Sequence, residues 1–111
     1  MAIRKIKTRD TIWAGSSFHR PISRRDKMPW EKDHSGVYGV YDEDGGKVLS
    51  GTLAPTTDRK HLVLMIRGDQ TLDLDGRYIV IVELTDLAVP GYVEGLADIE
   101  LTVKTRRAGT S

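Results

Sequence analysis

Apolar and polar residues alternate over several short stretches of the chain, and this alternation predicts β-strands. Residues 98–106 place Ile99, Leu101 and Val103 on one face and polar residues on the other, which is the period of two of a half-buried strand. Residues 77–84 are mostly β-branched, aromatic or leucine on both faces. This composition is typical of a central strand that is covered on both sides.

Turn sequences divide the rest of the chain into further strands. The segment 42–46, Asp-Glu-Asp-Gly-Gly, separates predicted strands at 36–41 and 47–53. Its glycines can take the positive φ that a short hairpin requires, so these two strands are predicted to pair. Residues 61–66 are again apolar on both faces, and 3–13 fits an edge strand with weaker alternation.

The order of these strands and turns predicts an all-β fold. Further turns are predicted at 73–76 and 89–91, where Asp, Gly and Pro gather, and no capped amphipathic stretch is long enough for a helix. Six to seven short antiparallel strands favour an Ig-like β-sandwich, with a small barrel as the alternative. Since the chain has no cysteine, the likeness to antibody domains is one of architecture. Residues 1–111 are predicted to form one domain.

Residues 14–35 do not fit this pattern. The segment has two prolines and no periodicity, and it is longer than the usual loop of a compact domain. We expect an irregular arm that contacts other molecules, because its apolar residues stand among arginines and tryptophan is a preferred interface anchor. The alternative is a loop that folds back onto its own sandwich. Together with the tail at 104–111, the candidate interface residues are Phe18, Arg20, Arg24, Arg25, Met28, Trp30, Arg106 and Arg107.

The net charge of +1 is a sum over unlike parts of the chain. Residues 1–35 carry nine basic and four acidic side chains, residues 36–103 carry five basic and twelve acidic ones, and 104–111 adds three basic ones. This division predicts that the basic segment of one copy lies on the acidic body of another copy or of an acidic neighbour. A solvated surface with uneven charge is the alternative.

No arrangement of residues predicts catalysis or a bound cofactor. Without cysteine, the chain offers no disulfide, no thiolate ligand for zinc and no cysteine nucleophile. His19, His34 and His61 lie outside any metal-ligand spacing, and no Gly-x-Ser-x-Gly sequence marks an exposed serine nucleophile. We therefore predict a protein that is not an enzyme, holds no cofactor or metal, and has no small-molecule substrate.

Several short motifs fit a binding function, and each also has an ordinary structural explanation. Acidic residues at 42–44, Asp73 and Asp75 fit calcium binding between loops, although Asp-Gly sequences are equally common in turns. The tripeptide Arg-Gly-Asp at 67–69 matches an integrin-recognition motif, but it stands where a strand-ending turn needs Gly and Asp.

The basic arm also permits binding to nucleic acid. Its arginines stand beside Phe18 and Trp30, and stacking aromatic residues within a basic surface are typical of such proteins. However, the body of the chain is acidic and the predicted sheet has no aromatic pair on an exposed face. Nucleic acid is therefore the less favoured partner.

The sequence also indicates in which compartment the protein is expected. It begins with polar residues and has no apolar run of the roughly 18 residues that a membrane span needs. We expect neither a signal peptide nor a membrane segment. A cytosol-like compartment, or export by an assembly route, is the expectation that follows.

From residue 36 to 104 the turns and strands follow a characteristic layout. Its sequences are Gly-Val-Tyr-Asp-Glu-Asp-Gly-Gly-Lys-Val at 39–48, Gly-Thr-Leu at 51–53, a Leu/Val strand at 62–66, Asp-Gln-Thr-Leu-Asp-Leu at 69–74, Asp-Gly-Arg-Tyr at 75–78, Val-Glu-Leu-Thr-Asp at 82–86, Tyr-Val-Glu-Gly at 92–95 and Ile-Glu-Leu-Thr-Val at 99–103. This layout resembles the small Ig-like domains of tailed-bacteriophage virion proteins, in particular the N-terminal domain of the phage baseplate upper protein family.

The resemblance implies a virion structural subunit that is assembled in the host cytoplasm with copies of itself and other virion proteins. Residues 8–11 depart from the family, with Thr-Arg-Asp-Thr where Arg-Gly-Asp-Thr is frequent, and 14–35 has no counterpart. We predict a tail, baseplate or tail-fibre-docking subunit that assembles through its arm and sheet edge. The alternatives are a capsid decoration or head–tail joining protein, a nucleic-acid-binding module, and a calcium- or glycan-binding domain.

Overall fold

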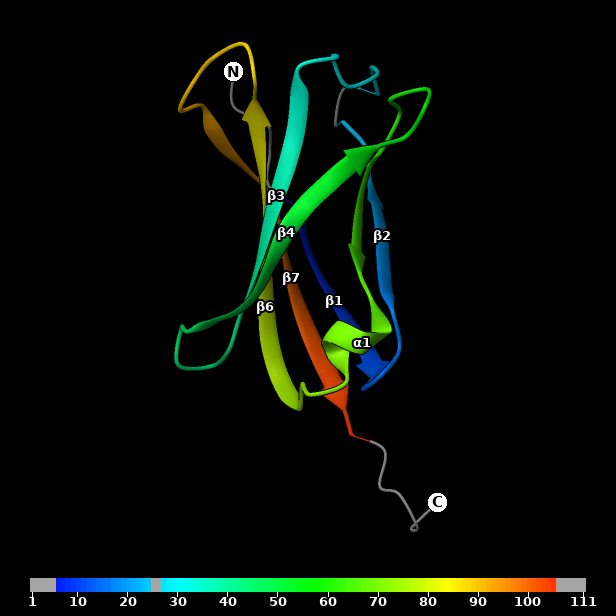
Figure 1. Cartoon of the computed structure of the whole chain (residues 1–111), viewed down its shortest axis with the longest axis vertical. Coiled ribbons are helices and arrows are strands. Elements are labelled where there is room, and N and C mark those ends of the chain that lie inside the picture. Colours follow the sequence, from blue (N-terminus) through cyan, green and yellow to red (C-terminus); the bar gives the residue numbers. More distant parts are fainter. Residues whose placement is uncertain (1–5, 25–26, 106–111) are drawn as a thin grey trace.

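The computed structural model describes residues 6–24 and 27–105, which form seven strands and one short helix (Figure 1). Every strand predicted from the sequence is present, although residues 3–5 of the predicted edge strand lie outside the described residues, and one further strand lies inside the predicted arm. The elements are β1 (Ile6–Trp13), β2 (Phe18–Ile22), β3 (His34–Tyr41), β4 (Lys47–Pro55), β5 (Leu62–Ile66), α1 (Gly68–Thr71), β6 (Gly76–Asp86) and β7 (Val93–Lys104).

The strands are arranged in the order β1-β7-β6-β3-β4-β5-β2. The first five form one layer, and β4 leaves it near its end, where Ala54 and Pro55 pair with β5 of the second layer. All pairs are antiparallel except β1 with β7, which is parallel. The prediction of purely antiparallel strands is wrong at this pair. The chain is an Ig-like β-sandwich, in which buried side chains of the larger layer and of β2 and β5 form one core.

The core lies between the two layers and is built from alternate residues of the strands. In β6, Val80, Val82 and Leu84 are buried, as the period of two requires. Ile79 of the same strand points to the outer face and is 46% exposed. The prediction that this strand is covered on both faces is therefore wrong, because none of the elements within residues 6–24 and 27–105 packs on its outer side.

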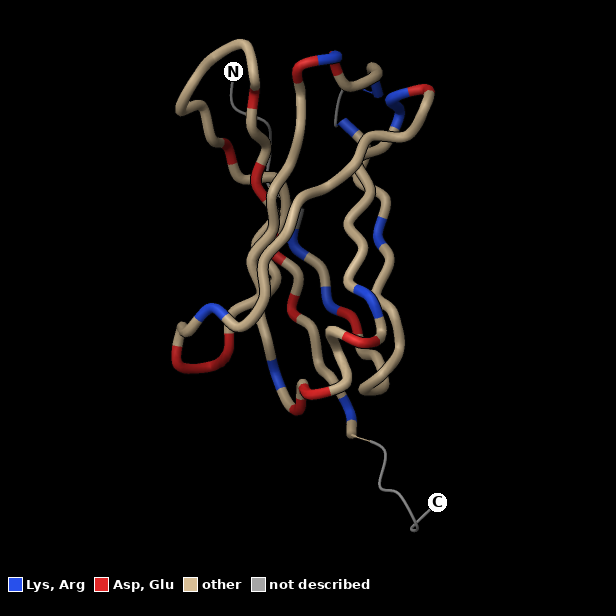
Figure 2. Tube along the Cα trace, viewed as in Figure 1, with Lys and Arg blue, Asp and Glu red and all other residues tan. Residues whose placement is uncertain are grey.

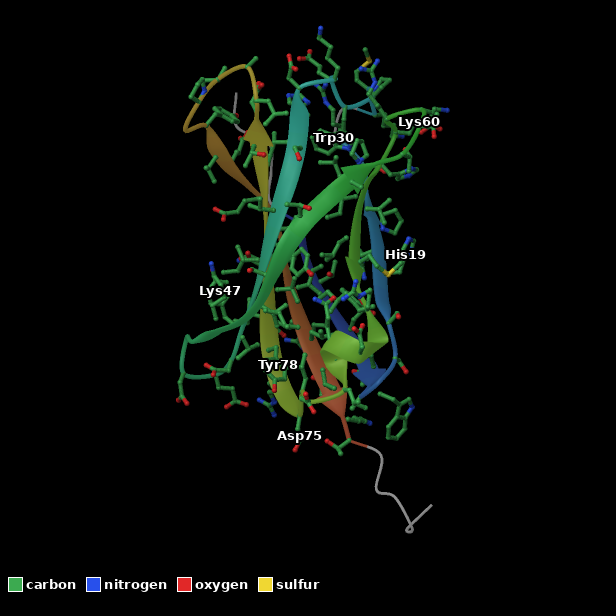
Figure 3. The ribbon with its side chains drawn as sticks, viewed as in Figure 1. His19, Trp30, Lys47, Lys60, Asp75 and Tyr78 are labelled. Carbon is green, nitrogen blue, oxygen red and sulfur yellow. The ribbon has the colours of Figure 1, made fainter. Side chains whose placement is uncertain are left out.

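A hydrogen-bonded tyrosine fixes the turn that leads into β6. The Tyr78 hydroxyl accepts from the backbone N–H of Asp75 at 3.0 Å and donates to the Asp75 carbonyl at 3.1 Å, and Figure 3 shows the two residues together. This is the tyrosine corner of Ig-like sandwiches, which stands two residues before the second cysteine of antibody domains. Here Val80 occupies that position and is fully buried, so packing takes the place of a crosslink.

The predicted irregular arm at 14–35 contains a strand. Phe18 and Ile22 of β2 are buried in the core, and Arg20 lies between them on the same side of the strand. The Arg20 guanidinium forms an ion pair with Asp10 of β1, which shares a face with the core-packed Ile12. Because a charged pair occupies inward positions of two strands, the apolar alternation is interrupted and the sequence alone does not show the strand.

Candidate interaction surface at the loop end

Three loops lie at the same end of the sandwich (Figure 1). They are residues 23–33 between β2 and β3, residues 56–61 between β4 and β5, and residues 87–92 between β6 and β7. We call this surface the loop end. Of its first loop, the structure describes all residues except 25 and 26.

The β6–β7 loop presents apolar side chains to solvent. Residues 87–93 read Leu-Ala-Val-Pro-Gly-Tyr-Val and carry no charge. Leu87, Val89, Tyr92 and Val93 are between 41% and 73% exposed. Soluble proteins seldom leave several large apolar side chains together in water, and such a patch marks a binding surface.

Hydrogen bonds hold this loop in one shape. The N–H of Leu87 donates to the carbonyl of Asp33 at 2.9 Å, and the N–H of Tyr92 donates to the carbonyl of Val89 at 3.0 Å. The Asp86 carboxylate accepts from the N–H of Ala88 at 2.9 Å. The apolar side chains are therefore displayed by a fixed backbone, which lowers the entropy cost of binding.

Carboxylates flank the apolar residues of this loop. The Tyr92 hydroxyl donates to Glu94 Oε2 at 2.6 Å, and this hydrogen bond raises the pKa of Tyr92 above its ordinary value. On the other side of the loop, Asp86 Oδ2 lies 3.9 Å from His34 Nε2. The β6–β7 side of the loop end is thus apolar with an acidic margin.

The β2–β3 loop folds onto its own core through Trp30. This side chain is 1% exposed, its indole N–H donates to the Ile22 carbonyl at 3.0 Å, and its ring meets His34 edge-on at 5.7 Å. The prediction that Phe18 and Trp30 contact another molecule is wrong for these side chains, because both are buried within the chain. Met28 is different, since it is 59% exposed.

The β4–β5 turn is joined to this loop and is basic. The Arg59 carbonyl accepts from the backbone N–H of Trp30 at 2.7 Å. Asp58 accepts from the N–H of Lys60 at 3.0 Å and from Thr56 Oγ1 at 2.7 Å, and these bonds lower the pKa of the Asp58 carboxyl. Trp30 and Lys60 lie at the same end of the molecule in Figure 3.

The loop end is consequently divided by charge, as Figure 2 shows. The β6–β7 side carries Asp86 and Glu94 beside its apolar residues, and Glu31, Lys32 and Asp33 lie between the two sides. Among its described residues the other side is mainly basic, and Asp58 is acidic. Its basic residues, from the β2–β3 and β4–β5 loops, are Arg24, Lys27, Arg59 and Lys60.

The other predicted interface residues are dispersed. Arg20 is used in the ion pair with Asp10, and Arg24 donates through Nη1 to the Pro29 carbonyl at 3.1 Å. Among the candidate residues that the structure describes, only Arg24 and Met28 therefore belong to the surface of the loop end. Arg25, Arg106 and Arg107 lie outside the described residues.

The remaining motifs have structural roles in the fold. Asp42 Oδ1 accepts from the N–H groups of Asp44 and Gly46, at 3.0 Å and 2.8 Å, and so closes the β3–β4 turn. Gly68 of the Arg-Gly-Asp tripeptide packs against the β1–β2 turn, where an added Cβ would lie 2.3 Å from the Gly15 carbonyl oxygen. Within residues 6–24 and 27–105, no three His, Cys, Asp or Glu side chains gather as a metal site.

The sequence contains a pattern that identifies the loop end, although the turn prediction at 89–91 is not based on it. Residues 89–91 are predicted as a turn, and the turn is present. The seven uncharged residues between Asp86 and Glu94 are longer than a tight hairpin turn needs. A long apolar connection between two strands is the pattern that identifies this surface.

Comparisons with known proteins add little to this description. No family model and no curated protein matches the sequence. Among solved structures, the fold is similar to the extracellular domain of the voltage-gated sodium channel β4 subunit, with 12% identity over 96% of this chain and 98% of that one and a TM-score of 0.43. In the part of the chain that the structure describes, no helix is long and apolar enough to cross a membrane.

Proposed function

We propose that this chain is a non-enzymatic structural subunit of a tailed-bacteriophage particle and that it binds its neighbours through the loop end. The observation that carries the proposal is the β6–β7 loop with the first residue of β7, where a hydrogen-bonded backbone displays the large apolar side chains of Leu87, Val89, Tyr92 and Val93. A surface of this kind is stable in water but gains free energy when a partner covers it. The assignment to a phage particle is supported by the sequence layout from 36 to 104.

The sheet edges are less suited to assembly than the loops. The edge strand β2 contains Pro21, which has no N–H to offer to an added strand. The other edge strand, β1, presents the charged residues Lys7 and Arg9 on its exposed face, and such residues discourage strand addition. We therefore place the contacts of this subunit at the loop end and retain tail, baseplate or fibre docking as its station.

A capsid decoration or head–tail joining protein would use the same surface. The number of copies per particle therefore distinguishes these positions from one in the tail or baseplate. Small multiples of three or six per particle fit a tail or baseplate, and hundreds of copies fit a capsid. Quantitative mass spectrometry of purified particles measures this number.

The experiment that tests the proposal measures how much of the chain is incorporated into particles. Cells that produce the particles would express wild-type chain or Leu87→Ser, and the amount in gradient-purified particles would be measured by mass spectrometry. We expect the variant to be reduced at least about tenfold, because a buried interface anchor contributes on this scale. Val48→Ser is the matched control, since Val48 is an exposed apolar residue near the β3–β4 turn.

Two results would contradict the proposal. Wild-type chain that is abundant in the lysate but missing from particles excludes a structural role. Equal incorporation of Leu87→Ser and Val48→Ser excludes the loop end as the contact. Thermal melting of each purified variant shows whether the substitution has disturbed the fold.

A further inference from the structure

The loop end is complementary to itself. One side is apolar with the carboxylates Asp86 and Glu94 at its margin, and the other side combines the exposed Met28 with basic residues of two loops. When two such ends face each other across a two-fold axis, the apolar acidic side of each copy meets the basic side of the other. Both contacts are then favourable at once, which is the property of an isologous interface.

We propose that two copies of this chain associate end to end through their loop ends. The β6–β7 loop of each copy lies on Met28 and on the basic residues Arg59 and Lys60 of its partner. This inference rests on the proposed function, because it names the partner of the same surface. It goes further in that it fixes the symmetry of the contact and its limit at two chains.

The charges favour a second copy over other occupants. An anionic membrane surface would repel Asp86 and Glu94 at the margin of the apolar loop. Stacking of nucleic-acid bases needs exposed aromatic rings, and the Trp30 ring of the basic side is buried. Among the described residues, the opposite end of the sandwich carries the acidic Asp42, Glu43, Asp73 and Asp75 and the exposed Leu72. It therefore complements mainly the basic side of the loop end and matches only half of it.

The size of the surface predicts a weak dimer. The molecule measures 50 × 30 × 20 Å, so its end offers about 600 Å² per partner, below the roughly 800 Å² of a standard stable interface. We expect a dissociation constant on the order of 10 to 100 µM for the isolated chain. Within a particle, additional neighbours would raise the effective affinity.

Charge reversal on the two sides tests the proposal. Lys60→Glu changes the basic side and Glu94→Lys changes the acidic side, and each alone places like charges opposite each other in both contacts of a homodimer. Sedimentation equilibrium of the full chain, from about 10 µM to about 1 mM, should show at least about tenfold weaker dimerisation for each variant. An equimolar mixture of the two variants should recover the dimer, because both contacts are again complementary.

Asp44→Lys is the matched control for Glu94→Lys. It makes the same change of charge in the β3–β4 turn at the opposite end, and we expect its dimerisation constant to equal that of the wild type. Thermal melting of the three variants verifies that they fold. A variant that fails to fold is replaced by Lys60→Gln or Glu94→Gln, for which a smaller but measurable weakening is expected.

Three results would overturn the inference. They are a wild-type chain that stays monomeric up to about 1 mM, a mixture that does not recover the dimer, and a mixture that grows beyond two chains, which would indicate head-to-tail contacts. Each outcome is separable from the proposed function. A monomeric chain that is nevertheless incorporated into particles refutes only the dimer, and a dimer that is absent from particles refutes only the structural role.

Discussion

At the scale of single residues, the two tryptophans have opposite environments. Trp30 is 1% exposed and bonded to the Ile22 carbonyl, whereas Trp13 at the end of β1 is 47% exposed. Residue type alone does not separate them, because tryptophan is enriched both in cores and in interfaces. The difference arises from the hydrogen bond and the apolar pocket that only the folded chain provides.

We predict that Trp30→Ala lowers the free energy of unfolding by about 3 to 5 kcal/mol, because it removes a large buried side chain and leaves a cavity. Trp13→Ala should cost less than about 1 kcal/mol, as is usual for an exposed residue. Urea denaturation of both variants measures the two values.

Trp30→Phe serves as the control for the hydrogen bond. It retains most of the packing but leaves the Ile22 carbonyl without its donor, and we expect a loss of about 1 to 3 kcal/mol. If instead Trp30→Ala unfolds at the wild-type urea concentration, the burial of this residue is wrong.

At the scale of elements, the short helix α1 is held in place by hydrogen bonds of two hydroxyl groups, those of Thr71 and Ser17. α1 has four residues, too few for a helix to be stable without tertiary contacts. The Thr71 hydroxyl is buried, accepts from the N–H of Gly15 at 3.1 Å and donates to the Ser16 carbonyl at 2.7 Å. The N–H of Gly68 adds a bond to Ser17 Oγ at 3.0 Å. Together these bonds fasten α1 to the β1–β2 turn.

We therefore predict that Thr71→Val lowers the free energy of unfolding by about 1 to 3 kcal/mol. The substitution keeps the shape of the side chain but leaves Gly15 and Ser16 with unpaired backbone groups. Thr71→Ser keeps the hydroxyl and should cost less, on the order of 1 kcal/mol for the lost methyl group. Urea denaturation compares the two, and an equal loss in both variants would show that packing rather than hydrogen bonding holds the helix.

The sequence predicts those elements whose residues follow a local rule. The period of two identifies β7, and the run of β-branched and aromatic residues identifies β6. The Asp-Gly turn identifies the β3–β4 hairpin. Neighbours in the sequence determine all three. β2 is not predicted from the sequence, because Arg20 occupies an inward position and pairs with Asp10 of another strand. α1 is not predicted either, because one turn is too short to show helical periodicity.

The candidate site, too, is predicted only where a local sequence pattern identifies it. The uncharged residues 87–93 are visible in the sequence, but their exposure depends on a fold that leaves the β6–β7 loop uncovered. The assignment of Phe18 and Trp30 to an interface used residue type and the lack of periodicity around them. Neither property distinguishes a residue that contacts a partner from one that contacts its own core.

At the scale of the whole molecule, the charged segments of the chain partly neutralise one another. β1 belongs to the basic segment and lies beside β7 of the acidic body, where Arg9 Nε lies 2.8 Å from Glu100 Oε2. Arg20 is likewise used within the chain. The intermolecular pairing predicted from the charge division therefore has competitors inside each copy. At the loop end, the β6–β7 loop is flanked by the acidic Asp86 and Glu94, whereas the β4–β5 turn on the other side is mainly basic (Figure 2).

This arrangement leads to a prediction about nucleic acid. The basic side of the loop end resembles a phosphate-binding surface, but the rings of Phe18 and Trp30 are buried and Tyr92 lies on the acidic side. Without stacking, only phosphate contacts remain. Each contact makes the slope of log affinity against log salt concentration more negative by about 0.7 for a single strand. With four such contacts, affinity for a single-stranded oligonucleotide should fall on the order of 50-fold between about 50 mM and about 200 mM salt.

Fluorescence anisotropy with a labelled oligonucleotide measures this dependence. We expect Lys60→Glu to make the negative slope shallower by about 0.7, since it removes one phosphate contact, and Asp44→Lys at the opposite end to leave the slope unchanged. Binding that persists at high salt would require stacking on aromatic rings, and the Trp30 ring of the basic side lies inside the core. Such a result would favour the nucleic-acid-binding alternative over assembly, because the same basic residues cannot contact phosphates and a second copy together.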